Sequence, residues 1–494
     1  MRIRSFVVEP AEEVVVKVHR EVLHLCGIEI GEEKADFDAM SVSHELSEGA
    51  PLSVRTTMRL TLADGTSEDC ATERTARAGE NARAERNRLV KLNFYELLRA
   101  RFDVPPAPWG IMYGVRPSKI VHRCLDAGQS REEIVARLTE DYRVSGEKAA
   151  LLADSSLYQR PFLKTARPDM VSVYVGIPFC LSRCLYCSFP AFVLPKRKTL
   201  DRFMEVFFRD LEAVREAVQR YRFRVQNIYV GGGTPTSLPD EYFEAMLRRV
   251  FESFRSEDTV EFSVEAGRPD SMTPAKLETM MRCRVNRVSV NPQTMQARTL
   301  RRIGRNHTPE DILRMYAELR GAGKFCINMD VIVGLPGEDE ADMTDTMEKL
   351  AALKPDDLTL HALALKKGSL LKMNLAETEL PDDGTVRRMF DIALDGARRM
   401  GLIPYYLYRQ GYQSGQLENV GCCRPGAESM YNIQIMEEHQ TILGIGGAAT
   451  SKIVDPETFR LKSSFNPKEI TVYLDKIDYY IEKRARLLAE AYGA

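Results

Sequence analysis

The chain has 494 residues, a length that accommodates two or three domains. Its apolar content of 44% and charged content of 28% are ordinary for a soluble protein. The net charge of −2 gives no electrostatic reason to expect a nucleic-acid partner or an anionic membrane surface. No apolar run of about 20 residues and no signal-like start is found, so we expect a cytoplasmic protein without membrane insertion. The ten cysteines are mostly scattered, which fits a reducing compartment.

Residues 1–168 form the first predicted domain, a small α+β unit whose role the residues do not reveal. Apolar and polar side chains alternate over residues 52–62, which predicts a half-buried strand, and residues 66–75 suit a return strand after a hairpin turn. Apolar residues at helical spacing predict a helix over 80–101. We expect Trp109, the only tryptophan, to pack this domain onto the next, with a ligand contact as the alternative.

Residues 169–375 form the second predicted domain, in which strand and helix patterns alternate. Strands are expected at 171–177, 226–231, 259–265, 285–290, 325–333 and 357–363, and helices at 199–221, 239–254, 273–282, 309–322 and 339–353. This alternation predicts a parallel α/β array. Six units fall short of the eight in a closed barrel, so we expect a partial (β/α)6 barrel with its sites at the C-terminal ends of the strands.

Residues 376–494 form the third predicted region, an α/β extension that we expect to complete the substrate site. The patterns predict a helix over 383–400, a strand over 405–409 and a final helix over 470–491. The fold class expected for the whole chain is therefore α/β: a partial barrel between an N-terminal α+β domain and a C-terminal extension.

Three cysteines lie close together after the first strand of the second domain. Cys180, Cys184 and Cys187 have the spacing C-x3-C-x2-C, and three thiolates on one tight loop can converge on a soft metal centre. A structural zinc ion usually takes four ligands, and no nearby cysteine or histidine supplies the fourth. Three ligands instead suit a [4Fe–4S] cluster with one open iron. The alternative is three incidental or zinc-binding cysteines.

This cysteine loop resembles the signature of radical S-adenosylmethionine (SAM) enzymes, whose open iron binds the amino and carboxyl groups of SAM. The run 231–236, Gly-Gly-Gly-Thr-Pro-Thr, follows the second strand, and glycines let a backbone approach a ligand closely. In that superfamily such a run receives the SAM amino group. Residues 170–370 are more narrowly similar to the oxygen-independent coproporphyrinogen III oxidase family.

The resemblance implies which residues hold the cofactors. The three cysteines would ligate the [4Fe–4S] cluster. The residues that would contact SAM are Tyr174, Tyr186, Gly232, Gly233, Thr234, Glu265, Gln293, Arg305, Asp330 and Ala364. Carboxylates can accept hydrogen bonds from ribose hydroxyls or an amino group, and an arginine can pair with a carboxylate. The four polar residues from Glu265 onward follow successive strands, so we expect them to face one cavity. Taken singly, each could instead be a strand cap, a surface cation or an ion-pair partner.

The chain departs from the family pattern at two positions. The family usually has a fourth cysteine where this chain has Phe189, and a histidine where it has Gly176. A three-thiolate cluster does not need the fourth cysteine, so these departures concern substrate handling. The long N-terminal domain and residues 288–295 are most similar to the HemZ-type branch, described as coproporphyrinogen dehydrogenase.

The resemblance implies a radical SAM oxidoreductase of porphyrin and haem biosynthesis. A reduced cluster would cleave SAM to a 5′-deoxyadenosyl radical, which removes hydrogen from a propionate side chain. Loss of CO2 and one electron leaves a vinyl group, and two rounds convert coproporphyrinogen III to protoporphyrinogen IX. The alternatives are a haem-binding or trafficking protein (HemW-like) and an enzyme acting on another tetrapyrrole. The expected partners are the tetrapyrrole and an electron donor such as flavodoxin or ferredoxin, and we expect a monomer.

For several other residues the sequence leaves two roles possible. The substrate carboxylates need cations, and Arg301, Arg302 and Arg409 are candidates beside Arg305, although the first two could equally be solvated helix charges. His361 is either a haem or substrate contact or an ordinary histidine near the barrel mouth. The Cys422-Cys423 pair is either a metal or redox pair or two buried thiols without a role.

Overall fold

The described part of the computed structural model divides into two compact units, Met1–Ala153 and Asp154–Ala494. The described residues are 1–32, 35–47, 51–77, 80–164, 167–323, 325–366, 369–373, 379–411 and 413–493. The division lies within helix α5 (Gly146–Lys164), upstream of the boundary expected at residue 168. The expected boundary at 375/376 lies outside the described residues, and the division into three domains stays a prediction.

The first unit contains one five-stranded sheet in the order β2-β1-β3-β4-β5. Its strands are β1 (Arg2–Glu9), β2 (Glu29–Ile30), β3 (Phe37–Leu46), β4 (Ser53–Thr61) and β5 (Ser67–Thr75), and its helices are α1 (Glu13–Leu25), α2 (Ala82–Phe102), α3 (Ser118–Asp126) and α4 (Arg131–Tyr142). The predicted hairpin and helix are confirmed as β4, β5 and α2. Alternate residues of β4, among them Met58 and Leu60, are fully buried in a core shared with Phe94 and Tyr95 of α2.

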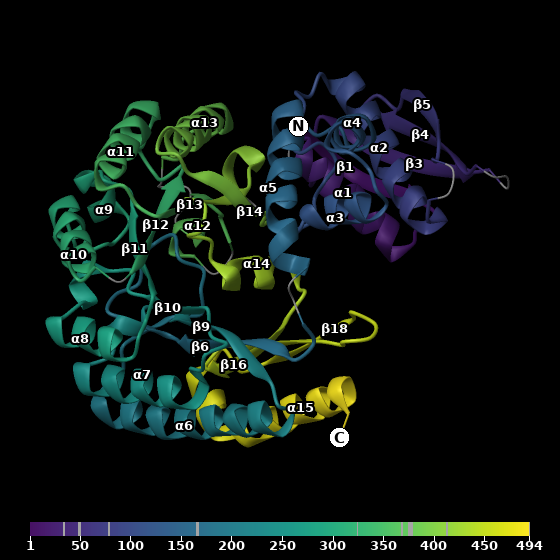
Figure 1. The fold of residues 1–494 in the computed structure, drawn as a ribbon. Coiled ribbons are helices and arrows are strands. Elements are labelled where there is room, and N and C mark those ends of the chain that lie inside the picture. Colours follow the sequence, from purple (N-terminus) through teal and green to yellow (C-terminus); the bar gives the residue numbers. More distant parts are fainter. Residues whose placement is uncertain are drawn as a thin grey trace. The chain divides into compact units, whose positions relative to one another are not determined.

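The second unit is built on an eleven-stranded sheet in the order β14-β15-β13-β12-β11-β10-β9-β6-β16-β17-β18. The predicted strands are confirmed as β6 (Met170–Ile177), β9 (Arg224–Gly232), β10 (Glu261–Glu265), β11 (Arg287–Gln293), β12 (Cys326–Val333) and β13 (Asp357–Ala362). The predicted helices are confirmed as α6 (Arg197–Arg220), α7 (Asp240–Phe254), α8 (Pro274–Arg282), α10 (Pro309–Gly321) and α11 (Glu340–Leu353). Neighbouring strands of this set are parallel, and the helices cover the outer face of the curved sheet (Figure 1).

The C-terminal region adds strands to both edges of this sheet. On one edge, β16 (Thr441–Gly446) lies parallel to β6 and is followed by β17 (Thr450–Val454) and β18 (Leu461–Phe465). On the other edge, β14 (Ile403–Tyr408) and β15 (Asn419–Cys423) are antiparallel additions to β13. The predicted helices are confirmed as α13 (Asp383–Arg399) and α15 (Ile470–Tyr492), and the predicted strand as β14, whereas β15–β18 and α14 (Met430–Glu437) were not predicted.

The barrel strands present a polar interior. In β10, Phe262 and Val264 alternate with Glu261, Ser263 and Glu265, so the two sets occupy opposite faces of the sheet. The register continues this arrangement, because a residue paired with its neighbour in a parallel sheet points to the same face. The polar face of the sheet is therefore available for a functional site, while the apolar face packs against the helices.

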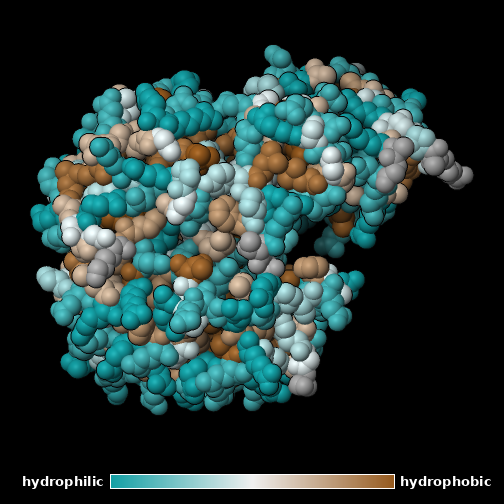
Figure 2. All heavy atoms as spheres, in the orientation of Figure 1, coloured by the Kyte–Doolittle hydropathy of each residue, from teal (hydrophilic) through white to brown (hydrophobic). Residues whose placement is uncertain are grey.

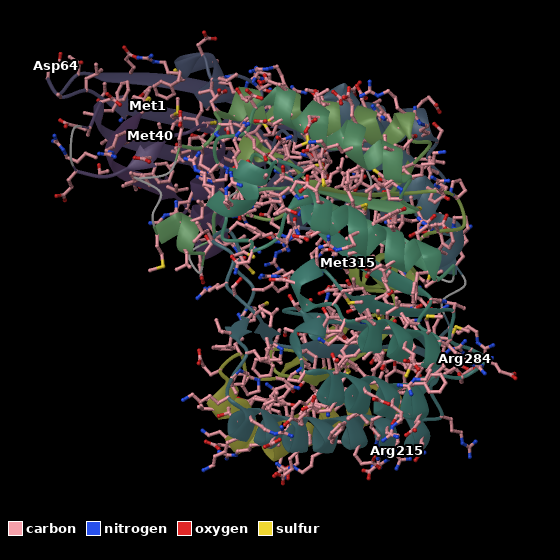
Figure 3. All side chains as sticks on the ribbon, turned by 90° about the vertical axis from the view of Figure 1, so that its left-hand side faces the viewer. Met1, Met40, Asp64, Arg215, Arg284 and Met315 are labelled. Atoms are coloured by element: carbon pink, nitrogen blue, oxygen red, sulfur yellow. The ribbon has the colours of Figure 1, made fainter. Side chains whose placement is uncertain are left out.

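The outer surface is mainly hydrophilic. Figure 2 shows hydrophilic residues over most of the visible face, with apolar residues scattered between them. In Figure 3, which faces the helical side of the barrel, Arg215 of α6 and Met315 of α10 mark the outer layer of helices. Within the described part of the chain, no helix has the length and apolar character to cross a membrane.

Candidate functional site

A cavity of about 730 Å³ lies at the C-terminal ends of the barrel strands. Every residue that the resemblance assigns to the cluster or to SAM lines it, from Tyr174 on β6 to Ala364 after β13. The prediction that Glu265, Gln293, Arg305 and Asp330 face one cavity is therefore confirmed. Their roles in binding stay predictions.

The cysteine loop is anchored through Leu185, which stands between the cysteines. Short strands β7 (Phe179–Cys180) and β8 (Phe192–Val193) pair at the base of the loop. The Leu185 amide donates a hydrogen bond to the Ile303 carbonyl (3.0 Å), and the Leu185 carbonyl accepts one from the Leu371 amide (2.8 Å). The loop packs on an apolar cluster of Leu300, Ile303, Ile332, Leu335, Leu363 and Leu371. Backbone bonds and apolar packing together hold the cysteines at the cavity.

Arg268 places a buried cation against this loop. Its guanidinium pairs with both oxygens of Asp270 (2.9 and 2.6 Å), donates to the Ser182 carbonyl (3.1 Å) and lies 4.0 Å from Cys184 Sγ. Only 2% of the residue is exposed. Burial raises the pKa of the Cys180 thiol, and the Arg268 charge opposes that shift. The sequence analysis did not single out Arg268, although it stands three residues after Glu265, at the end of a barrel strand.

The three thiols suit an iron–sulfur cluster better than a single ion. Among the described residues, no three His, Cys, Asp or Glu side chains come close enough to hold one metal ion. A [4Fe–4S] cluster does not require that, because each thiolate binds a different iron. A purely thiolate donor set is also the one that iron–sulfur clusters prefer.

The glycine run at the end of β9 brings the backbone close to the cavity. Gly232 has a φ of +112°, a left-handed conformation that suits glycine. A Cβ on Gly233 would lie 2.5 Å from the Phe179 carbonyl oxygen, and one on Gly231 would lie 2.7 Å from the carboxyl carbon of Glu265. The backbone contact at Gly233 and the left-handed φ of Gly232 require glycine at these two positions, so the run forms a side-chain-free cradle beside the cysteine loop.

Glu265 is held at this cradle by two hydrogen bonds. It accepts from the Tyr229 hydroxyl (2.7 Å) and from the Gly232 amide (3.2 Å). Burial raises the pKa of Glu265 to about 7, although these two hydrogen bonds act to lower it. The Tyr229 ring stacks on Tyr431 of α14, with ring centroids 4.4 Å apart, and Tyr174 lies beside both. The aromatic wall thus includes a residue from an element that the sequence analysis missed.

Polar atoms without partners gather at the end of β11. Among the described residues, Ser289 Oγ, Asn291 Oδ1, Gln293 Oε1 and Arg305 Nε are buried and have no hydrogen-bond partner. Leaving such a group unsatisfied costs about 1–3 kcal/mol. Gln293 also has a left-handed φ of 66°, a strained backbone conformation that is often found at binding sites. These residues fit a polar ligand such as SAM.

Asp330 and His361 are neighbours on β12 and β13. Asp330 accepts from Asn328 Nδ2 (2.8 Å) and lies 3.9 Å from His361 Nε2. Burial raises the pKa of Asp330, but hydrogen bonds and the charge of His361 outweigh it and hold the pKa below its usual value. His361 lines the same cavity beside Asp330, so its interpretations as a ligand contact and as an ordinary histidine near the barrel mouth both stay predictions.

Three of the four candidate carboxylate-binding arginines do not line the cavity, which contradicts their proposed role. Arg301 and Arg302 are exposed at the end of α9 (Ala297–Arg302), where the helix points them to solvent. Arg409 is buried and donates to the Gln416 carbonyl (3.2 Å). The cations in the lining are Arg183, Arg268, Arg305 and Lys452.

The Cys422-Cys423 pair is also absent from the lining of this cavity. Both thiols are fully buried in β15, opposite the first residues of β13. That position lies at the N-terminal end of β13, whereas the cysteine loop lies at the C-terminal ends of the strands. The interpretation of the pair as two buried thiols fits this position.

Known proteins are similar to this chain in sequence and in fold. Residues 174–350 match the model of the Radical SAM superfamily. The chain is 37% identical over 404 residues to the oxygen-independent coproporphyrinogen-III oxidase-like protein HemZ of Bacillus subtilis, covering 81% of this chain and 80% of that protein. It is 29% identical over 281 residues to the heme chaperone HemW of Lactococcus lactis, covering 56% of this chain and 69% of that protein. The structure of coproporphyrinogen III oxidase HemN from Escherichia coli has the same fold, with a TM-score of 0.51 and 22% identity. The match covers 65% of this chain and 72% of the HemN chain.

Proposed function

Because the chain belongs to the radical SAM superfamily, in the family of the coproporphyrinogen-III oxidase-like protein HemZ, we propose that it decarboxylates coproporphyrinogen III to protoporphyrinogen IX without oxygen. The observation that carries the proposal is one cavity in which three thiols, a glycine cradle and a set of unpartnered polar atoms meet beside stacked tyrosines.

The residues present fit the two cofactors of the superfamily. Cys180, Cys184 and Cys187 would hold a [4Fe–4S] cluster, and the cluster with SAM would supply one-electron cleavage chemistry. The backbone of the glycine cradle and Glu265 would receive the SAM amino group, because both sit at the same corner of the cavity. Asp330 would accept from ribose hydroxyls. Arg305 would pair with a carboxylate.

The rest of the lining suits a large substrate with an apolar ring and acidic edges. Phe189 and Phe465 line the cavity and are 64% and 58% exposed, so they present aromatic surface at its mouth. Arg183 lines the same space and can face a carboxylate, whereas Lys452, which also lines it, already pairs with Glu438 (3.3 Å). In each round a propionate would lose one hydrogen atom, CO2 and one electron to an acceptor, and a vinyl group would remain. The protein would orient the propionate and exclude water.

A haem-binding or trafficking function is the second candidate. Heme chaperones named HemW, from several bacteria, are 26–29% identical to this chain over about half its length. Phe189 also lines the cavity at the position where the coproporphyrinogen family usually has its fourth cysteine, a difference that would concern substrate handling. A reaction on another tetrapyrrole is the third possibility.

The test is anaerobic turnover by the reconstituted holoprotein with SAM, a reductant and coproporphyrinogen III. The proposal expects CO2 and 5′-deoxyadenosine in proportion to the vinyl groups formed, measured by chromatography and mass spectrometry. A Cys184→Ala protein is the control for background chemistry. Tight haem binding with slow SAM cleavage and no vinyl product would favour the trafficking function instead.

A further inference from the structure

We propose that His361, Asn419 and Tyr408 form a subsite that binds a propionate carboxylate of the tetrapyrrole through uncharged hydrogen-bond donors. These three residues, called the donor row below, stand on β13, β15 and β14. None of them is among the residues that the family resemblance assigns to the cluster or to SAM. The inference rests on the proposed function, because it says where the substrate of that function is held.

The donor row crosses three neighbouring strands at one level. In the order of the sheet, β15 lies between β14 and β13 at one edge (Figure 1). Tyr408 is paired with Asn419, and the pairing of Leu360 with Val420 brings His361 beside Asn419 on its other side. Directly opposed residues of antiparallel strands point to the same face, with Cβ atoms about 5 Å apart. All three residues line the cavity, so the row faces the ligand space.

The side-chain amide of Asn419 is held by its oxygen, which leaves its nitrogen without a partner. Its Oδ1 accepts from the Ala362 amide (3.0 Å) and from Gln413 Nε2 (3.0 Å). Gln413 is fixed in turn, because its Oε1 accepts from the Gln410 amide (2.8 Å). Among the described residues, none accepts a hydrogen bond from Asn419 Nδ2, although only 1% of Asn419 is exposed. A buried donor of this kind is costly unless a ligand accepts from it.

The other two members of the row can also donate. The Tyr408 hydroxyl oxygen accepts from Gln410 Nε2 (3.5 Å), so its hydrogen is available to a ligand. Burial raises the pKa of Tyr408 to about 12, and the charge of Asp330 acts in the same direction, so the hydroxyl keeps its proton at neutral pH. His361 can donate from a ring nitrogen. The row therefore presents donors from three side chains to one part of the cavity.

The charges around the row leave room for one more negative group. Asp330 stands on β12, and its carboxylate already accepts from Asn328 Nδ2 (2.8 Å). In the strand order His361, 3.9 Å from Asp330, separates that acid from Asn419. Among the described residues, no Lys or Arg of β13, β14 or β15 lines the cavity. Uncharged donors are thus what this wall offers, and a carboxylate can accept from several of them at once.

Tyrosine rings supply apolar surface beside the donors. Tyr406 lies two residues before Tyr408 on β14, and the two rings are nearly parallel with centroids 6.4 Å apart. The Tyr406 ring lies over Gly421, where any Cβ would collide with it, and its hydroxyl contacts Thr359 Oγ1 (3.3 Å). A propionate arm has two methylene groups and a carboxylate, so it needs both kinds of surface.

The test measures the binding of coproporphyrin III, the stable oxidised form of the proposed substrate, to the cluster-free full-length protein by fluorescence titration. Its tetramethyl ester is the matched control ligand, because it keeps the ring and lacks the charges. Asn419→Asp keeps the oxygen that accepts from Ala362 and Gln413 but replaces the NH2 donor by an oxygen. Tyr408→Phe keeps the ring and removes only the hydroxyl. Tyr479→Phe, at an exposed position of α15, is the control variant.

Each donor-row variant should bind coproporphyrin III about tenfold more weakly than the unaltered protein, the effect of losing one hydrogen bond to a charged group. Binding of the ester should be unchanged, and Tyr479→Phe should alter neither ligand. Circular dichroism checks the fold, and Tyr408→Phe covers the case in which Asn419→Asp impairs folding. Unchanged affinity for coproporphyrin III in the folded variants, or an equal loss for the acid and the ester, would overturn the proposal.

Two further ligands separate the sources of a carboxylate. Hemin, which also carries propionates, is titrated in parallel, and SAM binding to the reconstituted holoprotein is measured by equilibrium dialysis. A loss confined to hemin or to SAM would assign the donor row to that ligand and overturn the proposal. No turnover is measured, so a lack of vinyl product in the activity assay would refute the proposed function and leave this binding result standing.

Discussion

Individual side chains at the cavity depend on partners that are distant in the sequence. Glu265 is held by Tyr229 from the preceding strand, and the Tyr229 ring stacks on Tyr431, which lies about two hundred residues further along the chain. Arg268 reaches back to the cysteine loop through the Ser182 carbonyl. The chemistry of each residue is therefore set by neighbours that only the folded chain supplies.

The first prediction concerns the cysteines. Replacing Cys180, Cys184 or Cys187 by Ala should abolish the brown iron–sulfur absorbance and SAM cleavage, because thiolates are the iron ligands of such clusters. Cys422→Ala and Cys423→Ala should keep the absorbance, because these thiols are buried in β15 and do not line the cavity. Visible absorbance after anaerobic reconstitution measures the cluster content of both sets of variants. Loss of the chromophore in either β15 variant would contradict the ligand assignment.

The second prediction concerns pH and Glu338. Burial raises the pKa of this carboxyl from 4.5 to about 7, although Thr294 donates to it (2.6 Å). The folded protein therefore binds this proton more tightly than the unfolded chain does. The contribution of this bound proton to the free energy of unfolding is fully present below pH 4.5 and is lost as the pH rises through 7.

Glu338→Gln keeps a neutral side chain at every pH. Relative to the unaltered protein, its free energy of unfolding should improve by about 2–3 kcal/mol between pH 5 and pH 8. Urea unfolding of the cluster-free protein at the two pH values measures this difference. Glu348→Gln, at an exposed position of the nearby α11, is the control and should show no comparable change. A pH-independent difference for Glu338→Gln would refute the account.

Elements position the site through loops rather than through strands alone. The cysteine loop has only two short paired strands at its base, so its shape depends on Leu185, Arg268 and the apolar cluster beneath it. The glycine cradle is similarly fixed from outside, because Lys276 Nζ donates to the Thr236 carbonyl (2.7 Å) and the Ser271 carbonyl (2.9 Å). A buried cation thus holds the cysteine loop, and another holds the glycine cradle.

The third prediction tests Arg268 as the anchor of the cysteine loop. Arg268→Met removes the hydrogen bonds to the Ser182 carbonyl and to Asp270, which is itself exposed and stays hydrated, so the free energy of unfolding should fall by about 1–3 kcal/mol. Arg268→Lys keeps the charge but cannot pair with both oxygens of Asp270 as a guanidinium does. Its free energy of unfolding should therefore fall by less. Denaturant unfolding of the cluster-free protein and iron content after reconstitution are the measurements. Arg298→Met, which removes a half-exposed arginine from α9, is the control, and equal losses in both would argue against the anchor.

At the scale of the second unit, one buried ion pair ties the C-terminal helix to the barrel. Asp210 of α6 is fully buried and accepts from Arg484 NH2 of α15 (2.7 Å), from Asn466 Nδ2 (2.9 Å) and from the Gly446 amide at the end of β16 (2.8 Å). Three segments from the last fifty residues are thereby joined to a helix of the barrel. This connection keeps β16 beside β6, at one wall of the cavity.

The fourth prediction tests that connection. Arg484→Met removes the cation and leaves a buried carboxylate, so we expect the free energy of unfolding to fall by about 3–5 kcal/mol. Lys462→Met, which breaks the exposed pair with Glu490, should cost no more than about 1 kcal/mol. Guanidinium unfolding followed by circular dichroism measures both changes. Similar costs for the two variants would show that the buried pair does not connect these segments.

The sequence by itself determined the barrel and the cysteine loop of this protein. Hydrophobic periodicity is a local property, so the six strands and five helices of 169–375 were predicted with ends that differ by at most three residues. Cysteine and glycine motifs are local as well, and the three cysteines line the cavity together with Gly232, Gly233 and Thr234, as expected. Because strand order fixes which ends meet, the convergence of Glu265, Gln293, Arg305 and Asp330 could also be predicted.

Only the tertiary structure decided the parts that depend on long-range contacts. The short strands β15–β18 have little periodicity of their own and are stabilised by pairing with the barrel edges, so no local pattern indicates them. Arg301 and Arg302 are chemically identical to Arg305, yet the end of α9 turns them to solvent while Arg305 enters the cavity. Asp210 and Arg484 meet across 274 residues, a distance that no motif spans. Contacts of this kind arise from packing, and sequence patterns do not encode them.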